Sequence, residues 1–118
     1  MRIMGFLKAD AQSEAGVPPT PELMEKMGAF VQEVMAAGVI ESTDGLSMSA
    51  MGKRISGTPG NYKTDAGPFP LDQVVSAYAI YNVPSWDEAE RWTKRFLDVL
   101  GGGECELRPF IEFDGPPA

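Results

Sequence analysis

The sequence predicts a single α+β domain, residues 1–118, in which two helices pack on one face of an antiparallel sheet. The chain has 118 residues, 43% of them hydrophobic and 23% charged, which is typical of one globular domain. Apolar residues follow strand-like patterns at both ends and in the middle, and two segments repeat them at helical spacing. The resulting order of strand, helix, two to four strands, helix and strand matches the ferredoxin-like βαββαβ pattern.

The first strand and first helix are predicted from apolar pattern and capping residues. Residues 2–7 are mostly apolar and predict a strand, whereas residues 9–19 are small and polar and predict a loop. Thr20 followed by Pro21 is typical of a helix start, because a hydroxyl caps the first amides and proline suits the first turn. The helix should end before Gly38. Its apolar stripe consists of Leu23, Met27, Phe30, Val31, Val34 and Met35.

The middle of the chain predicts further strands. Residues 39–46 predict a second strand, and short strands at 54–56 and 62–64 flank a turn that contains glycine. Residues 74–83 are rich in β-branched and aromatic side chains and give the strongest strand pattern of the chain.

The C-terminal part predicts a second helix and an edge strand. Ser85 and Glu88 have the spacing of a capping box, and three glycines at 101–103 end the helix. Residues 105–113 alternate as in a strand, which Pro109 confines to a sheet edge or a bulge because proline has no amide hydrogen. Residues 114–118 are expected to fray.

Composition excludes several classes of function. The formal net charge is −7, and the sequence has no Lys/Arg cluster of the kind that binds nucleic acid or anionic membranes. No apolar window is long enough to span a membrane, and the N-terminus lacks the pattern of a signal peptide. Cys105 is the only cysteine, so no disulfide forms within the chain, in agreement with a cytoplasmic location. With no histidine, the sequence predicts no metal site and no cofactor.

Two helices cover only one face of such a sheet, and the other face is called the open face below. Strand alternation places Arg108 and Phe110 on it, in a mixture of charged and apolar groups. A face of this kind is too apolar to stay bare, so we expect either a small-molecule ligand or a second copy of the chain to cover it.

Asp65 is the candidate catalytic residue. It precedes a turn, Ala66-Gly67-Pro68-Phe69, in which glycine and proline restrict the backbone. A carboxylate aimed by stiff neighbours at the rim of a sheet is a candidate general base. The alternative is a turn-forming Asp whose side chain bonds to nearby backbone amides.

Four further residues are candidates for ligand binding. Arg108 lies mid-strand next to Glu106, and either binds an anion or forms a structural pair at a subunit interface. Tyr78 and Tyr81 point to opposite faces, so at most one of them lines a given cavity, and Tyr78 is the candidate. The remaining candidates are Phe69, as a stacking platform or a core residue, and Glu41, as a carboxylate partner of Asp65.

Seven short motifs, in this order, resemble YCII-related proteins of the DGPF type. That resemblance implies a ferredoxin-like fold that pairs into a dimeric α/β barrel, with a poorly defined biochemical function. The chain departs from the family pattern in three ways. Ala66 interrupts the Asp-Gly-Pro-Phe run, the stretch after the Phe is the shorter Pro70-Leu71-Asp72-Gln73, and no histidine is present for the His–Asp pair of YCII relatives. The motifs are Met1-Arg2-Ile3-Met4, Met27-Gly28-Ala29-Phe30, Ala37-Gly38-Val39, Asp44-Gly45-Leu46, Asp65-Ala66-Gly67-Pro68-Phe69, Asp87-Glu88-Ala89 and Glu106-Leu107-Arg108-Pro109.

The sequence leaves two functional hypotheses. In the first, a cytoplasmic homodimer binds a small organic molecule in a cleft between subunits, with weak catalysis as an open question. In the second, which follows from the resemblance to proteins associated with sigma factors, the chain is a non-enzymatic interaction module in transcription. The missing histidine favours binding over acid–base chemistry.

Overall fold

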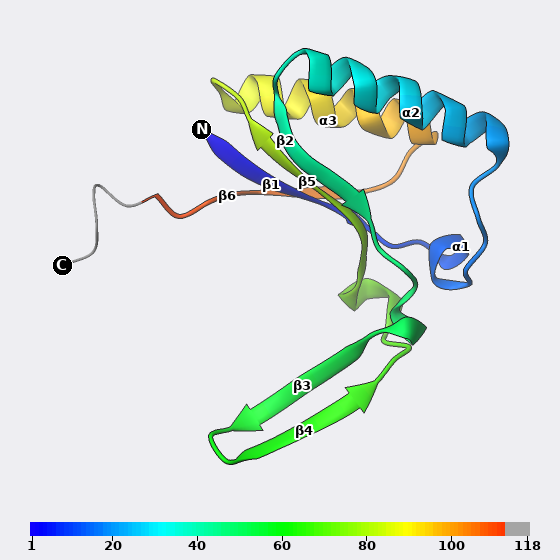
Figure 1. Cartoon of the computed structure of the whole chain (residues 1–118), viewed down its shortest axis with the longest axis vertical. Helices are drawn as coiled ribbons and strands as arrows, with labels where there is room; N and C mark the ends of the chain where they lie inside the picture. Colours follow the sequence, from blue (N-terminus) through cyan, green and yellow to red (C-terminus); the bar gives the residue numbers. More distant parts are fainter. Residues whose placement is uncertain (113–118) are drawn as a thin grey trace.

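The computed structural model describes residues 1–112 and confirms an α+β architecture with antiparallel strands. Two long helices lie side by side over one face of a sheet, and a separate hairpin projects from the opposite end (Figure 1). The elements are β1 (Arg2–Lys8), α1 (Ala11–Glu14), α2 (Pro21–Ala36), β2 (Ile40–Gly45), β3 (Lys53–Thr58), β4 (Asn61–Ala66), β5 (Val75–Asn82), α3 (Trp86–Leu100) and β6 (Cys105–Pro109), with single 3-10 turns at Ser49–Met51 and Leu71–Gln73.

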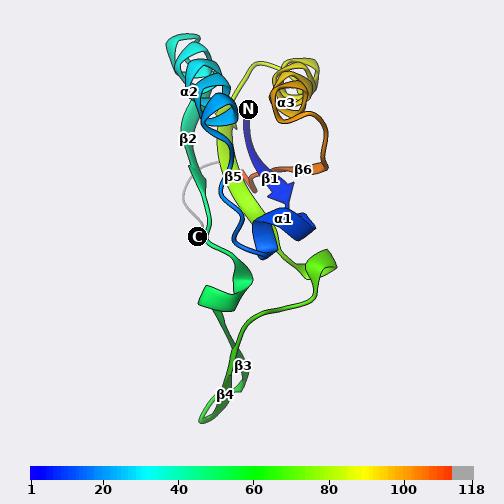
Figure 2. The same ribbon diagram turned by 90° about the vertical axis from the view of Figure 1, so that its right-hand side faces the viewer.

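The main sheet has the strand order β2-β5-β1-β6, and every neighbouring pair is antiparallel. Its register places Gly5 of β1 opposite both Ala79 of β5 and Leu107 of β6. Helix α2 connects β1 to β2, and α3 connects β5 to β6, so both connections return over the same face (Figures 1 and 2). The predicted order of elements is therefore present, with β3 and β4 inserted between β2 and β5.

The core lies between this sheet and the two helices. Ile3 of β1 and Val34 of α2 are fully buried, and Phe30 packs near Trp92 with ring centroids 6.3 Å apart. The apolar stripes predicted for both helices thus face the sheet. The buried apolar residues are Ile3, Phe30, Val34, Tyr81, Val83, Ala89 and Trp92.

The helix ends follow the predicted capping chemistry, with one difference. Thr20 Oγ1 accepts a hydrogen bond from the Leu23 amide (3.1 Å), and Ser85 Oγ accepts one from the Glu88 amide (3.3 Å). The Glu88 carboxylate pairs with Arg91 (2.7 Å), one helical turn on, and not with the Ser85 amide as the capping box predicts. Only half of that capping box forms.

Two predicted segments differ in the structure. The expected loop at 9–19 contains α1, where the Asp10 side chain accepts from the Ser13 amide (2.8 Å) and the Asp10 amide donates to Ser13 Oγ (3.0 Å). Serine stands where a capping box usually has Glu or Gln, which explains why the motif was missed. The last strand ends at Pro109 and not at 113, in keeping with the donor that proline lacks. Residue 113 and the tail at 114–118 lie outside the described residues.

The hairpin β3–β4, residues 53–66, is called the arm below. Every one of its residues is exposed, and it projects away from the sheet (Figures 1 and 2). The radius of gyration is 16.6 Å, whereas a compact chain of this length has about 13–14 Å. Ile55 and Tyr62 share one face of the arm and are 71% and 62% exposed. A two-stranded hairpin has little stability alone, so this apolar face favours a partner.

The Ala66-Gly67-Pro68-Phe69 turn joins the arm to the body of the protein. The Gly67 amide donates to Gly52 O (3.0 Å), and the Phe69 amide donates to Ser49 Oγ (3.0 Å). A Cβ atom at Gly67 would overlap the carbonyl oxygen of Ser49, so the close backbone approach requires glycine here. Ser49 in turn donates its amide hydrogen to Glu14 Oε1 (2.9 Å), which ties this junction to α1.

Candidate functional site

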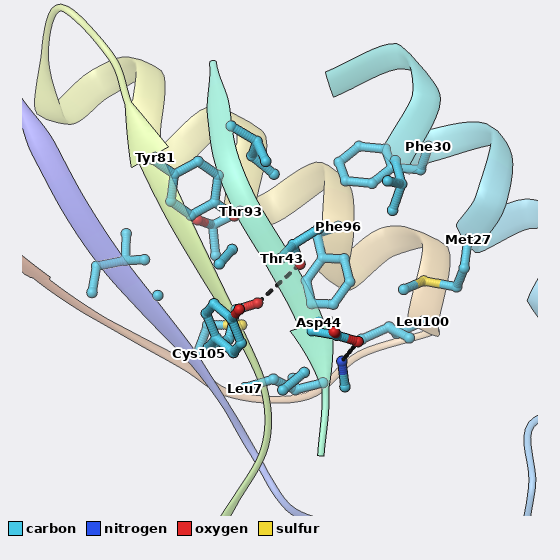
Figure 3. A pocket seen from close by; sticks show the side chains of 18 residues that line it. Leu7, Met27, Phe30, Thr43, Asp44, Tyr81, Thr93, Phe96, Leu100 and Cys105 are labelled. Carbon is cyan, nitrogen blue, oxygen red and sulfur yellow. Dashed lines mark hydrogen bonds between the residues drawn. The ribbon is translucent and has the colours of Figure 1, made fainter. Parts of the chain in front are cut away.

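A cavity of about 330 Å³ lies between the two long helices and the main sheet. We call it the helix–sheet cavity; Figure 3 shows its lining side chains. It is partly open to solvent, and most of its lining is apolar. A cavity of this volume is at the lower end of the range of small-molecule sites in proteins.

Small residues form the floor of the cavity. Gly5, Ala77 and Ala79 lie on the helix-covered face of β1 and β5; larger side chains at the two alanines would fill the space, whereas Gly5 is closely covered by its neighbours. A Cβ atom at Gly5 would lie 3.1 Å from the Tyr81 ring and 3.2 Å from Leu107.

Aromatic and aliphatic side chains form the walls. Phe30 of α2 and Phe96 of α3 have ring centroids 6.1 Å apart, and both line the cavity (Figure 3). The walls therefore suit a flat apolar molecule, which can pack against ring faces and edges. The other apolar wall residues are Leu7, Met27, Val31, Ile40, Leu100 and Leu107.

A small number of polar groups reach the same cavity. Thr43 Oγ1 donates to the carbonyl oxygen of Tyr78 (2.9 Å), and Thr93 Oγ1 donates to the carbonyl oxygen of Ala89 (2.8 Å). Tyr81 lies beside Thr93, and Cys105 of β6 lies near Tyr81 (Figure 3). Asp44 borders the cavity, but it lies opposite Tyr78 in the register, so its carboxylate is on the open-face side, where Oδ1 accepts from the Gly45 amide (2.9 Å).

Burial holds the two weakly acidic groups of the cavity in their protonated forms. It raises the pKa of Tyr81 above its ordinary 10.0; the Thr93 hydroxyl opposes this shift, and the nearby Cys105 sulfur adds to it. Burial also raises the pKa of the Cys105 thiol above 9.0, with a further contribution from the Glu104 charge. Both groups are therefore neutral at pH 7, which favours hydrogen bonding over nucleophilic or basic chemistry.

These raised pKa values predict a loss of stability in alkali. The folded state keeps protons on Tyr81 and Cys105 that the unfolded chain releases, so their stabilising effect is complete below about pH 9 and is lost as the pH rises through the folded pKa values. We expect the urea concentration at the unfolding midpoint to decrease as the pH rises from about 8 to about 11. Tyr81→Phe should make this dependence on pH less steep. Tyr62→Phe, on the exposed arm, is the control. Equal slopes for the two variants would contradict the assignment to Tyr81.

Of the five site residues predicted from the sequence, Tyr78 lies at the cavity. Its backbone borders the space, its ring belongs to the open face, and its hydroxyl lies 3.0 Å from Ser42 Oγ. Tyr81 lies on the opposite, helix-covered face, as strand alternation predicts.

The structure does not bring the other four predicted residues into the helix–sheet cavity. Glu41 forms an exposed ion pair with Arg2 (3.1 Å). Arg108 pairs with Glu106 (3.3 Å), and its side chain is 70% exposed on the open face. Glu41 and Asp65 lie on separate sheets, so they form no carboxylate pair within one chain.

Asp65 and Phe69 belong to the arm and its base. The Asp65 carboxylate is 54% exposed and lies 3.4 Å from Lys63 Nζ on the same strand. Phe69 is half-buried, and the Arg54 guanidinium lies 4.0 Å above its ring centroid. Phe69 therefore stacks with a cation of the protein itself.

The sequence analysis missed the groups that shape the cavity. Gly5, Ala77 and Ala79 share one face only once the register of β1 and β5 is known. The available signal was the alternation of small residues along two apolar strands, which is compatible with ordinary close packing. Tyr81 and Thr93 come from a strand and a helix whose contact cannot be inferred from spacing.

Neither a metal cluster nor a membrane-spanning helix is present in residues 1–112. No three Cys, Asp or Glu side chains of this region gather closely enough to hold a metal ion. None of its helices combines the length and apolar character needed to cross a bilayer.

No protein-family model matches this chain, and no curated protein matches it. Among solved structures, it is similar to 5-chloro-2-hydroxyhydroquinone dehydrochlorinase (TftG) from Burkholderia phenoliruptrix AC1100, in complex with 2,5-dihydroxybenzoquinone. The match has a TM-score of 0.53 and 14% sequence identity, and covers 96% of each chain. At this identity the likeness concerns the fold, which the two chains share along nearly their whole length.

Proposed function

We propose that this protein binds a small, mainly apolar organic molecule in the helix–sheet cavity. The observation that carries the proposal is the cavity itself, a space of about 330 Å³ beneath two helices whose floor includes the small side chains of Ala77 and Ala79. An engineered apolar cavity of about 150 Å³ accommodates benzene, so this volume suits a molecule of one or two rings. A well-packed core would leave no such space.

The structural neighbour supports the proposal at the level of the fold. That dehydrochlorinase was solved in complex with 2,5-dihydroxybenzoquinone, a one-ring molecule. A fold of this kind can thus hold a ring of the size proposed here. No observation in residues 1–112 favours the alternative of a transcription module, and the neutral state of Tyr81 and Cys105 favours binding over catalysis.

Naphthalene, an uncharged two-ring hydrocarbon, tests the proposal. In titrations followed by amide chemical shifts, we expect saturable changes that centre on the cavity floor and walls, including Ala79, Thr43 and Phe96. The apolar lining supplies the affinity because it removes the hydrocarbon surface from water. Absence of saturable shifts, or shifts confined to the open face, would overturn the proposal.

We propose further that the chain forms a homodimer of ferredoxin-like subunits, a dimeric α/β barrel, through the open face. Alternation from the buried Ile3 and Gly5 places apolar side chains on that face, all of them half-buried in the single chain. The exposed apolar side of the arm gives a second surface for the same partner. The apolar residues of the open face are Met4, Phe6, Tyr78, Ile80 and Phe110.

The catalytic role of Asp65 stays a prediction that depends on this pairing. Within one chain, Asp65 lies on the arm and pairs with Lys63, outside the helix–sheet cavity. It therefore takes part in a site only if the arm of one copy reaches the other. Arg108 and Glu41 lie on the main sheet, and they would border a cleft between subunits only if two copies pair.

A further inference from the structure

We propose that the helix–sheet cavity selects an uncharged ring compound that carries a hydroxyl group, such as a phenol. This inference rests on the proposed function and adds the chemical class of the ligand. It follows from a count of the hydrogen-bonding groups at the cavity, from the charges that line it, and from its aromatic walls.

The hydroxyl groups of the two threonines already donate their hydrogens to backbone carbonyl groups. Thr43 Oγ1 donates to Tyr78 O (2.9 Å), and Thr93 Oγ1 donates to Ala89 O (2.8 Å). A hydroxyl has one hydrogen and two lone pairs, so each threonine offers the cavity only acceptor capacity. A ligand that approaches them must bring a donor.

The Tyr81 hydroxyl can both donate and accept a hydrogen bond. Tyr81 is 5% exposed, and its hydroxyl, which interacts with Thr93 and stays protonated at neutral pH, can donate or accept. A ligand hydroxyl can therefore donate to a threonine or to Tyr81 and accept from Tyr81. An ether or a ketone can only accept, so it leaves the acceptor capacity of Thr43 unused, whereas Thr93 keeps its interaction with Tyr81.

The charges at the cavity exclude anionic ligands. Within residues 1–112 its lining contains no Lys or Arg, and the nearest carboxylate, that of Asp44, lies toward the open face. An anion placed there would lose its hydration without gaining a counter-charge, which is strongly unfavourable in an apolar site. Asp44 is exposed, so an ammonium group attracted to it would remain at the rim in water and not among the rings.

Four naphthalene derivatives test the inference at pH 7, where 2-naphthol is uncharged: 2-naphthol, 2-methoxynaphthalene, 2-naphthoate and naphthalene. We expect 2-naphthol to bind roughly 5–10 times more tightly than its methyl ether, the effect of about one net hydrogen bond. We expect 2-naphthoate to bind at least about 100 times more weakly than 2-naphthol. Tyr81→Phe should reduce the preference for naphthol over the ether to about twofold or less.

Matched variants separate this inference from the proposed function. Thr93→Val should also reduce the preference for naphthol, whereas Tyr62→Phe on the arm should leave it unchanged. If none of the four compounds binds, the proposed function fails. If naphthalene and the ether bind as tightly as naphthol, or if naphthoate binds best, the cavity is a ligand site but the inferred chemical class is wrong.

Discussion

Ala79→Phe should abolish naphthalene binding and at the same time make the protein more stable. Ala79 lies on the cavity floor, between Gly5 and Thr43 on the neighbouring strands. A phenylalanine ring there would occupy the space of the ligand and bury about 100 Å² of additional apolar surface. At about 25 cal/mol/Å², this burial contributes roughly 2 kcal/mol to the free energy of unfolding. We expect affinity to fall at least about 100-fold while the melting temperature rises by several degrees.

This combination distinguishes a ligand site from a part of the core. Most substitutions that remove binding also destabilise a protein, and a gain in stability with loss of binding is expected only where empty space is filled. Ala29→Phe, on the exposed side of α2, is the control and should change neither quantity much. Ala77→Leu repeats the test if Ala79→Phe folds poorly. Unchanged affinity in both floor variants would show that naphthalene binds elsewhere.

Ile80→Asp should convert the proposed homodimer into a monomer. Ile80 lies on the open face, opposite Met4 on β1 and Ser42 on β2. In a single chain the new carboxylate would remain in contact with water, because this position is only half-buried. In a dimer through the open face, it would be buried among apolar side chains without a counter-charge. We expect the dissociation constant to rise by at least about 100-fold, measured by sedimentation velocity.

Two further variants make the result interpretable. Gln32→Asp makes the same change of charge on the outer side of α2, beyond the helix layer, and should leave the association state unchanged. Ile55→Asp on the arm, where the side chain is 71% exposed, should weaken the dimer without affecting the folding of one chain. A wild-type protein that sediments as a monomer at all concentrations would contradict the proposed pairing. A dimer that survives both Ile80→Asp and Ile55→Asp would place the interface on another surface.

The fold was largely predictable because local chemistry determines most of its elements. Thr20 with Pro21 and Ser85 marked the two long helices, and both side chains cap them in the structure. The strand at 74–83 was predicted within one residue of β5 at each end. The errors occurred where a less common residue completed the capping box, as Ser13 does at the third position of α1, and where Pro109 ended a strand early.

The candidate site was far less predictable, because it depends on contacts between distant parts of the chain. The turn that follows Asp65 made it the candidate catalytic residue, yet the structure places its carboxylate on the exposed arm. The cavity exists because small residues on β1 and β5 lie side by side beneath two aromatic rings, which only register and helix packing determine. The resemblance to YCII-related proteins, and the dimer that it implies, stay predictions.

One layer of backbone separates the helix–sheet cavity from the open face. Strand β5 carries Ala79 toward the helices and Ile80 toward the opposite side, so the two surfaces are formed by consecutive residues. A ligand that alters the twist of β5 would therefore change the dissociation constant of the proposed homodimer. By thermodynamic reciprocity, dimer and monomer would then differ in their affinity for the ligand by the same factor. Ligand binding would therefore depend on the concentration of the protein.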